Sequence, residues 1–237
     1  MPVFRLRDND LSFPHPSFAE GNGLLAVGGD LSSERLVMAY QNGIFPWFEE
    51  DGIFYWYTPD PRCVVFPSEL KVHKSMHSIF NQHKFRYTLD TCFERVMRSC
   101  GEISRKGEHS SWITDNFLTG YLRLHQIGIA HSVEVWQENE LVGGLYGVSI
   151  GKMFFGESMF ANVANASKAG FITLTRALER TGFVLIDCQL ETAHLISLGA
   201  RNIRREDFLE ALDRNTFERT LVGKWRFSET GSIDLLV

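Results

Sequence analysis

The sequence lacks several features that would narrow its function at once. No stretch of the 237 residues approaches the roughly 20 apolar residues that a membrane-spanning helix needs, and the N-terminal stretch has no apolar segment typical of a signal peptide. The four cysteines are scattered, without a Cys-x-x-Cys pair, which favours reduced thiols over disulfides or a zinc site. We therefore expect a cytoplasmic protein without membrane contacts.

Positive charge is not in excess either. The net charge is −5, which argues against a protein that coats nucleic acid along its whole surface. Basic residues nevertheless gather in two stretches, 71–86 and 201–207. These stretches are either solvated helix faces or a local surface for nucleic acid, and the sequence alone leaves both interpretations open.

The first sixty residues are rich in Gly, Pro and aromatic side chains. Residues 11–32 predict turns around one short strand. A short helix is expected next, with Ser32 as its N-cap and Gly43 just past its end. An aromatic loop and a strand follow, up to Pro59–Pro61. We expect a domain boundary there, with a small N-terminal α/β domain over 1–60 and a larger domain over 61–237.

The pattern of the larger domain predicts a mixed α/β (α+β) fold. Helices are expected over 68–82, 90–101 and 114–128, with Thr114 as a cap, and strands over 85–89, 131–137, 140–150, 152–160 and 183–190. A helix over 164–182 separates the last two strands, which predicts parallel neighbours with a right-handed crossover. The order β-β-β-α-β-α resembles the acyltransferase core of the GNAT type.

Charged and polar side chains stand on two strands that are otherwise apolar. Alternation places Asp187 and Gln189 on one face, opposite a face expected to be core, which carries Val184, Ile186, Cys188 and Leu190. Glu157 is expected to share a face with Met153, Phe155 and Met159.

On neighbouring strands, Glu157 and Asp187 would lie close together. Such a pair could bind a cation, share a proton, or act as acid and base. Alternatively, each carboxylate is held by loop N–H groups or by an arginine. Five glycines on the same sheet, between 143 and 156, suggest room for a substrate chain.

Nine motifs in order, from about residue 20 to about residue 205, resemble the leucyl/phenylalanyl-tRNA–protein transferase family. They are GNGLLAVGGDLS, AYQNGIFPWF, YWYTPDPR, SWIT, AHSVEVW, LVGGLYGV, FGESMF, NASK and IDCQ. The resemblance implies a small N-terminal domain packed on a GNAT-like C-terminal domain. It also implies an enzyme that transfers Leu or Phe, and Met less well, from aminoacyl-tRNA to proteins beginning with Arg or Lys, marking them for degradation by the bacterial N-end rule.

The same resemblance implies a cofactor-free reaction. The aminoacyl ester is already activated, so neither ATP nor a metal is needed. The lack of a Gly-x-x-x-x-Gly-Lys-[Ser/Thr] loop and of a cluster with metal-ligand spacing fits this expectation. The partners implied are aminoacyl-tRNA and acceptor proteins, and we expect a monomer.

Residue roles follow from the matched motifs. The IDCQ match implies a catalytic pair in which Asp187 orients Gln189 and draws charge off the attacking amine, while Gln189 contacts the reacting centre. Substrate positioning, with the ribose hydroxyl as proton shuttle, is an equal alternative. Glu157 is expected to bind a cationic group of either the donor or the acceptor.

The substrate also needs an apolar pocket and a stacking surface. The pocket candidates are buried residues of the same sheet and its helix: Met153, Phe155, Leu145, Phe171, Phe183 and, last, Ile186 because it lies on the expected core face. Trp47 and Trp112 are the expected stacking partners of the terminal adenosine, with Tyr121 as a hydrogen-bonding neighbour.

Three other functions remain as alternatives at this point. They are a CoA-dependent N-acetyltransferase, a tRNA-dependent transferase acting on a cell-wall precursor, and an adaptor that binds tRNA or peptide without catalysis. The segment FANVANASK has no glycine, which disfavours the Gly-rich pyrophosphate turn of a CoA enzyme.

Overall fold

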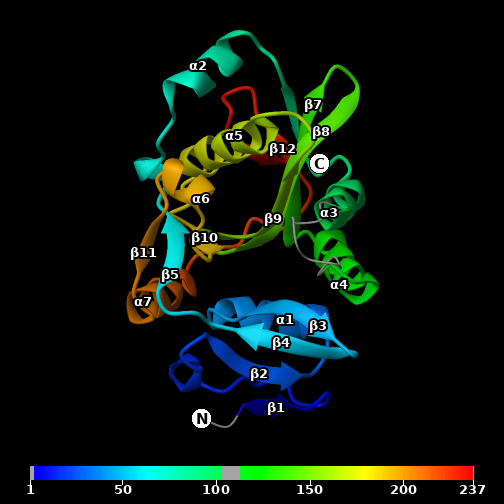
Figure 1. Cartoon of the computed structure of the whole chain (residues 1–237), viewed down its shortest axis with the longest axis vertical. Coiled ribbons are helices and arrows are strands. Elements are labelled where there is room, and N and C mark those ends of the chain that lie inside the picture. The colour runs from blue at the N-terminus through cyan, green and yellow to red at the C-terminus, as the bar shows by residue number, and fades with distance from the viewer. Residues whose placement is uncertain (1–2, 103–112, 237) are drawn as a thin grey trace.

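The computed structural model describes residues 3–102 and 113–236, and two sheets organise this part of the chain (Figure 1). The N-terminal sheet has the order β1-β2-β4-β3. Its strands are β1 (Phe4–Leu6), β2 (Leu24–Gly28), β3 (Phe45–Glu50) and β4 (Ile53–Tyr57). The aromatic segment expected to be a loop and one strand is thus a two-stranded hairpin. A register shift between Pro46 and Phe48 disturbs the alternation that would have revealed the first of its strands.

Helix α1 (Ser33–Gln41) follows β2 and begins as predicted. The Ser32 side chain accepts a hydrogen bond from the Arg35 N–H, which satisfies one of the free donors of the first turn. Gly43 ends the helix with φ 71°, a backbone angle that favours glycine. The helix contacts α4 and β8 of the larger part of the molecule.

The central sheet has seven strands in the order β11-β5-β10-β9-β8-β7-β6. These are β5 (Arg62–Val65), β6 (Arg86–Leu89), β7 (Ala130–Gln137), β8 (Glu140–Ile150), β9 (Met153–Ala161), β10 (Leu185–Gln189) and β11 (Arg201–Ile203). Strands β9 and β10 pair in parallel, and α5 (Ala166–Arg180) connects them. The predicted α/β class and the order of the elements from β7 to β10 are therefore confirmed, whereas strand β11 was not predicted.

Helices cover both faces of the central sheet. Helix α5 packs on one face, and α3 (Phe93–Glu102) and α4 (Asp115–Gln126) pack on the other. The remaining elements are η1 (Pro16–Phe18), η2 (Pro67–Glu69), α2 (Lys74–Asn81), α6 (Ala193–Ser197), α7 (Arg205–Asn215), β12 (Trp225–Phe227) and β13 (Ile233–Leu235). The helix expected over 68–82 is thus shorter than predicted, since η2 and a connecting segment occupy its first part.

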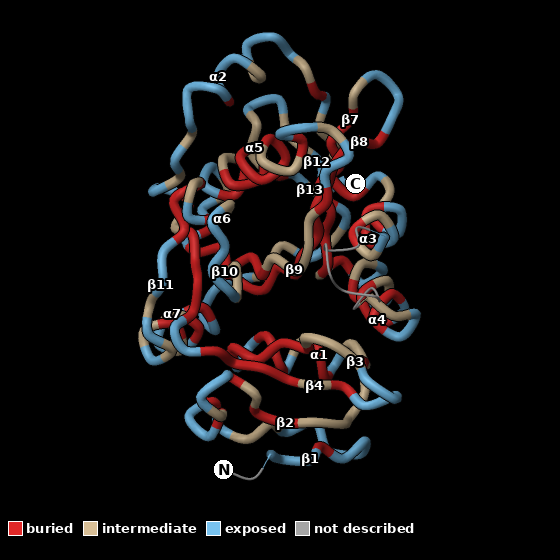
Figure 2. The backbone as a smooth tube through the Cα atoms, viewed as in Figure 1, coloured by how far each residue is buried: buried red, intermediate tan, exposed pale blue. Residues whose placement is uncertain are grey.

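A single hydrophobic core joins the N-terminal sheet to the central sheet. It contains Trp56 of β4, Leu36 of α1, Phe117 of α4 and Phe155 of β9, all buried. Figure 2 shows buried stretches in α1 and β4. The chain passes from one sheet to the other between β4 and β5, and the domain limits 1–60 and 61–237 stay a prediction. None of the described helices is long and apolar enough to cross a bilayer.

Candidate active site

A β-bulge sets the position of Glu157. Strand β9 pairs with β8, and the register runs from Ser158 opposite Tyr146 directly to Gly156 opposite Gly147. Glu157 is therefore the extra residue, and the side chains before and after it alternate out of step. Phe155 packs in the core shared with the N-terminal sheet, whereas Met159 packs with the core under α5. The prediction that both share one face was wrong because the sequence does not show the bulge.

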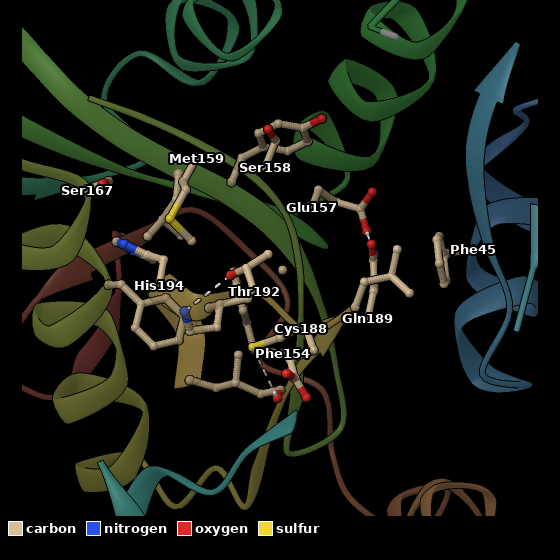
Figure 3. A pocket seen from close by; sticks show the side chains of 18 of the residues that line it. Phe45, Phe154, Glu157, Ser158, Met159, Ser167, Cys188, Gln189, Thr192 and His194 are labelled. Atoms are coloured by element: carbon tan, nitrogen blue, oxygen red, sulfur yellow. Dashed lines mark hydrogen bonds between the residues drawn. The ribbon is translucent and has the colours of Figure 1, made fainter. Parts of the chain in front are cut away.

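Glu157 is held by two neutral donors. Tyr121 donates its hydroxyl hydrogen to Oε2 at 2.8 Å, and the Gln189 amide donates to Oε1 at 2.8 Å. Figure 3 shows the Glu157 and Gln189 side chains pointing toward each other. The Tyr121 hydroxyl in turn contacts the Tyr40 hydroxyl. These contacts link α1, α4, β9 and β10 around a single carboxyl group.

Burial decides the protonation of Glu157. It raises the pKa of this carboxyl from 4.5 to about 7, although the nearby hydroxyls of Tyr121 and Tyr40 and the Gln189 amide oppose the shift. The pKa values of Tyr40 and Tyr121 are raised well above 10, again mainly by burial. Near neutral pH the site therefore holds a carboxyl group close to half ionisation, supported by phenols that stay protonated.

Asp187 sits beside this group but is sealed from solvent. Its carboxylate is fully buried and accepts two hydrogen bonds from Arg62, Nε to Oδ1 at 2.8 Å and Nη2 to Oδ2 at 2.6 Å. Oδ1 also accepts the backbone N–H of Gln189 at 2.9 Å. The orienting role expected of Asp187 therefore has a physical basis in this contact. Its ion pair with Arg62 gives no basis for drawing charge directly off a substrate amine.

Gln189 has an unusual backbone. Its φ is 62°, in the left-handed region that non-glycine residues rarely adopt, and the pairing of β10 with β5 shifts register between Asp187 and Gln189. The side chain leaves the strand at this point and reaches Glu157. Strain of this kind at a strand end is common where a side chain is aimed for function.

A pocket of about 670 Å³ opens beside the Glu157–Gln189 pair, in the size range of small-molecule sites. Strand β3 of the N-terminal sheet, strands β8 to β10 and helices α5 and α6 contribute to it. The lining residues are Phe45, Pro46, Trp47, Leu145, Tyr146, Phe154, Gly156, Glu157, Ser158, Met159, Ser167, Phe171, Ile186, Cys188, Gln189, Leu190, Glu191, Thr192, His194 and Leu195. In Figure 3, Met159, Ser167 and His194 lie at the end opposite Phe45.

The structure brings four of the predicted pocket and stacking residues to this space, namely Leu145, Phe171, Ile186 and Trp47. The other three predicted pocket residues, Met153, Phe155 and Phe183, do not line it. Met153 and Phe155 face the core shared with the N-terminal sheet, and Phe183 packs against Trp225. Ile186, ranked last in the prediction, is a wall residue.

The sequence did not predict most of the other residues that line the pocket. Phe154 and Met159 lie on the α5 side of the sheet with Leu145 and Ile186. Alternation with Phe155 was the available signal for Phe154, whereas the bulge hides the position of Met159. The predicted core face of β10 is also partly wrong, because Val184 is 57% exposed and Leu190 is 36% exposed.

The space that the five sheet glycines were expected to leave for a substrate is mostly filled by neighbouring atoms of the protein. An added Cβ at Gly147 would lie 2.2 Å from the Phe155 carbonyl oxygen, and one at Gly143 would lie 2.7 Å from the Ala166 Cβ. Of the five glycines, Gly156 lines the pocket. The glycines therefore serve close packing of the sheet more than they open space for a substrate chain.

The three residues predicted to bind the terminal adenosine differ in their positions. Trp47 lines the pocket and packs edge-on against Tyr57, with ring centroids 4.7 Å apart. Tyr121 is fully buried and lies behind Glu157, so that it supports the carboxyl group and does not line the pocket. Trp112 lies outside the described residues.

Cys188 and His194 both line the pocket, and burial shifts the pKa of each. Burial raises the pKa of the Cys188 thiol well above 9, which keeps it protonated and unreactive. Burial, with Lys168 nearby, lowers the pKa of His194. Across residues 3–102 and 113–236, no three His, Cys, Asp or Glu side chains are grouped as a metal ion would require.

Comparison with known proteins identifies the family. The profile described as leucyl/phenylalanyl-tRNA protein transferase matches residues 64–213, and that of its N-terminal domain matches 29–60. A leucyl/phenylalanyl-tRNA–protein transferase of Syntrophobacter fumaroxidans is 52% identical over 91% of this chain and 92% of its own length. That of Solidesulfovibrio magneticus is 49% identical over 97% of this chain and 93% of its own.

Among solved structures, a GCN5-related N-acetyltransferase from Kribbella flavida matches part of this chain. It shares 9% identity over 70% of this chain and 59% of that chain, with a TM-score of 0.38. The matches to curated sequences are far stronger and span both the N-terminal and central sheets. The chain therefore belongs to the leucyl/phenylalanyl-tRNA–protein transferase family.

Proposed function

We propose that this protein transfers Leu or Phe, and Met less well, from aminoacyl-tRNA to the N-terminal amine of proteins that begin with Arg or Lys. The observation that supports this best is the Gln189 amide, which donates to Glu157 at the wall of an apolar pocket. A polar pair beside a pocket of this kind suits an aminoacyl ester with an uncharged side chain.

The pocket suits the donor side chain. Its predominantly hydrophobic walls include Leu145, Phe154, Phe171 and Ile186, which favour an apolar group and disfavour a charged one. A hydrophobic pocket discriminates one methylene by only about 1–3 kcal/mol. Acceptance of Leu, Phe and Met together is therefore expected on physical grounds.

The reaction needs few groups from the protein. The acceptor amine attacks the ester carbonyl, a C–N bond forms, the C–O bond to the tRNA ribose breaks, and the amine proton ends on the released ribose hydroxyl. Gln189 orients the reacting groups by hydrogen bonding, because a neutral amide is a poor base. Asp187 holds the Gln189 backbone, and the ribose oxygen itself accepts the proton.

Glu157 suits a cationic substrate group. Its pKa near 7 means that an arriving positive charge shifts it to the carboxylate form at neutral pH. A buried anion is tolerable when its counter-ion arrives with the substrate. This explains why a strand in the protein interior carries a glutamate, and it fits either the donor ammonium or the basic acceptor.

The wider setting follows from the same proposal. Acceptor proteins marked with Leu or Phe would enter degradation by the bacterial N-end rule, in the cytoplasm, with the enzyme acting as a monomer. The tRNA would lie against the basic stretch around α2, where Lys71 and Lys74 are exposed.

The test is transfer of labelled Phe from Phe-tRNA to a peptide that begins with Arg, with an otherwise identical Ala peptide as control. A new peptide bond on the Arg peptide supports the proposal. Tight tRNA binding without a new bond would indicate an adaptor, and a shift of melting temperature with acetyl-CoA would favour an N-acetyltransferase. Preference for a muropeptide acceptor would indicate transfer to a cell-wall precursor.

A further inference from the structure

Arg62 occupies a completely enclosed position between the two sheets. It is the first residue of β5, directly after the segment that leaves β4, and it has no exposed surface. Its guanidinium lies between two aromatic rings, 4.8 Å from the centroid of Phe45 and 4.7 Å from that of Phe208. Phe45 belongs to β3 and Phe208 to α7, so this side chain contacts both parts of the molecule.

The Arg62 guanidinium is connected to the candidate active site through the Asp187 carboxylate. Its Nε and Nη2 atoms donate to the two oxygens of Asp187, a geometry that fixes both position and orientation. The same Oδ1 that accepts Nε also accepts the backbone N–H of Gln189. Two hydrogen bonds thus connect Arg62 to the backbone of Gln189, the residue whose side-chain amide contacts Glu157.

One of the two stacking rings also faces the pocket. Phe45 covers the guanidinium and lines the pocket wall next to Trp47. Arg62 therefore contacts one residue of the pocket wall as well as the carboxylate that holds the Gln189 backbone, and a lysine at this position keeps a cation near Phe45.

We propose that Arg62 is a positioning residue for the reaction: through the Asp187 carboxylate, it fixes the left-handed backbone at Gln189 and holds the Gln189 amide against Glu157. This inference rests on the proposed function of the Glu157–Gln189 pair. Arg62 touches no substrate, and it acts by keeping the Asp187 carboxylate correctly oriented to accept the Gln189 N–H.

The consequence is a separation of turnover from donor binding. Without the two hydrogen bonds from Arg62, the Asp187 carboxylate is free to rotate, and the Gln189 N–H then loses its acceptor. The pocket residues Leu145, Phe154 and Phe171 take no part in the hydrogen bonds that join Arg62, Asp187 and Gln189. Donor affinity should therefore persist while turnover falls.

A matched control is available in the N-terminal part of the chain. Arg35 of α1 is also fully buried, and its guanidinium donates to the carbonyl oxygens of Arg7 and Asp10. It has the same enclosed character and does not line the pocket. Replacing either arginine by lysine keeps the charge and removes the planar, multidentate contact.

The experiment measures kcat, donor KM and thermal unfolding for wild type, Arg62→Lys and Arg35→Lys, using Phe-tRNA and the Arg peptide below the unfolding range of every variant. We expect Arg62→Lys to lower kcat at least tenfold with donor KM within twofold of wild type. Arg35→Lys should lower the melting temperature and leave kcat within twofold. Because lysine retains the charge that balances Asp187, this variant avoids the unpaired anion that Arg62→Met would create.

The outcomes separate the two proposals. A wild-type protein that transfers no Phe to the peptide refutes the proposed function, and the positioning role falls with it. A wild-type protein that transfers Phe, with an Arg62→Lys variant of normal kcat, refutes the positioning role alone. Equal losses of kcat in Arg62→Lys and Arg35→Lys would also refute it, since both would then reflect the general cost of disturbing a buried arginine.

Discussion

Carboxylates in two regions of the central sheet are held in different ways. At the β6–β7 edge, Glu134 accepts from the backbone N–H groups of Thr91 and Cys92 and from the hydroxyls of Thr88 and Ser132. At the β9–β10 centre, Glu157 accepts from a phenol and an amide and lines the pocket. The first arrangement saturates a carboxylate inside the protein, and the second leaves one facing a space that a substrate can enter.

The two aspartates show the same contrast. Asp90 at the β6–β7 edge accepts from His131 and from the backbone N–H groups of Ser132 and Trp225. Asp187 at the centre is paired with Arg62 and also carries the Gln189 N–H. Burial alone therefore does not mark a functional acid in this protein. What distinguishes the centre is a direct connection from each carboxylate to the pocket wall.

The largest expected effect comes from removing one buried carboxylate in each region. Asp187→Ala and Glu134→Ala should each lower the free energy of unfolding by roughly 3–5 kcal/mol, because polar groups are left buried without partners. Only Asp187→Ala should also lower turnover, by about 10²-fold or more, since Gln189 loses its orientation. Denaturant unfolding and kcat at a temperature where both variants are folded test this. If Asp187→Ala reduces tRNA affinity as much as turnover, its role is general and structural.

Glu157→Gln sharpens the comparison through pH. The pKa of Glu157 is raised from 4.5 to about 7 in the folded protein, so the folded state keeps a proton that the unfolded chain releases between these values. The free energy of unfolding of wild type should therefore fall relative to that of Glu157→Gln as pH rises from about 4.5 to about 7. The fall should be about 3 kcal/mol at most, with no further change above pH 8.

Urea unfolding of both proteins at pH 5, 6, 7 and 8 measures this difference, with exposed Glu140→Gln as the control. If the difference in unfolding free energy between wild type and Glu157→Gln stays constant across the whole range, Glu157 titrates normally. The proposed distinction between Glu157 and the other carboxylates of the sheet would then be wrong.

A smaller effect is expected from a comparison of one pocket-wall phenylalanine with one core phenylalanine. Phe154→Leu and Phe155→Leu replace adjacent buried rings that lie on opposite faces of β9. Each should cost about 1–2 kcal/mol of stability. Phe154→Leu should in addition change donor KM by up to about tenfold, whereas Phe155→Leu should leave it unchanged. Steady-state kinetics with Phe-tRNA and Leu-tRNA decide the point, and a donor effect at Phe155 alone would reverse the assignment of the faces.

The smallest effect concerns the tRNA. Lys71 and Lys74 are exposed near α2, whereas Arg204 is paired with Asp207 at 2.6 Å. Lys71→Gln with Lys74→Gln should reduce the slope of log affinity against log salt concentration by about 1–2. Arg204→Gln should leave the slope nearly unchanged. Filter binding of tRNA over a range of salt measures the slopes, and the reverse ranking would move the tRNA to the 201–207 stretch.

Much of the fold follows from local signals in the sequence. The caps at Ser32 and Thr114 and the turn glycine Gly43 lie where the pattern of side chains places them. The parallel pair β9–β10 follows from a helix flanked by two apolar runs. These features depend on nearby residues, so a single sequence is enough to reveal them.

The finer geometry of the site depends on long-range contacts that the sequence does not reveal. The bulge at Glu157 needs the register of β8, and it places Met159 on the face of the strand opposite Phe155. The partner of Asp187 is Arg62, 125 positions away along the chain. Alternation correctly brought Glu157, Asp187 and Gln189 together, but it could not say which carboxylate is sealed and which lines the pocket.

The most direct test of the central claim is the single-turnover rate of Phe transfer from Phe-tRNA to an Arg peptide by wild type and by Gln189→Ala. If the Glu157–Gln189 pair is the reaction centre, Gln189→Ala should be about 10²–10³-fold slower at unchanged donor affinity. A Gln189→Ala variant that transfers Phe at the wild-type rate would contradict the claim and place the reaction elsewhere in the molecule.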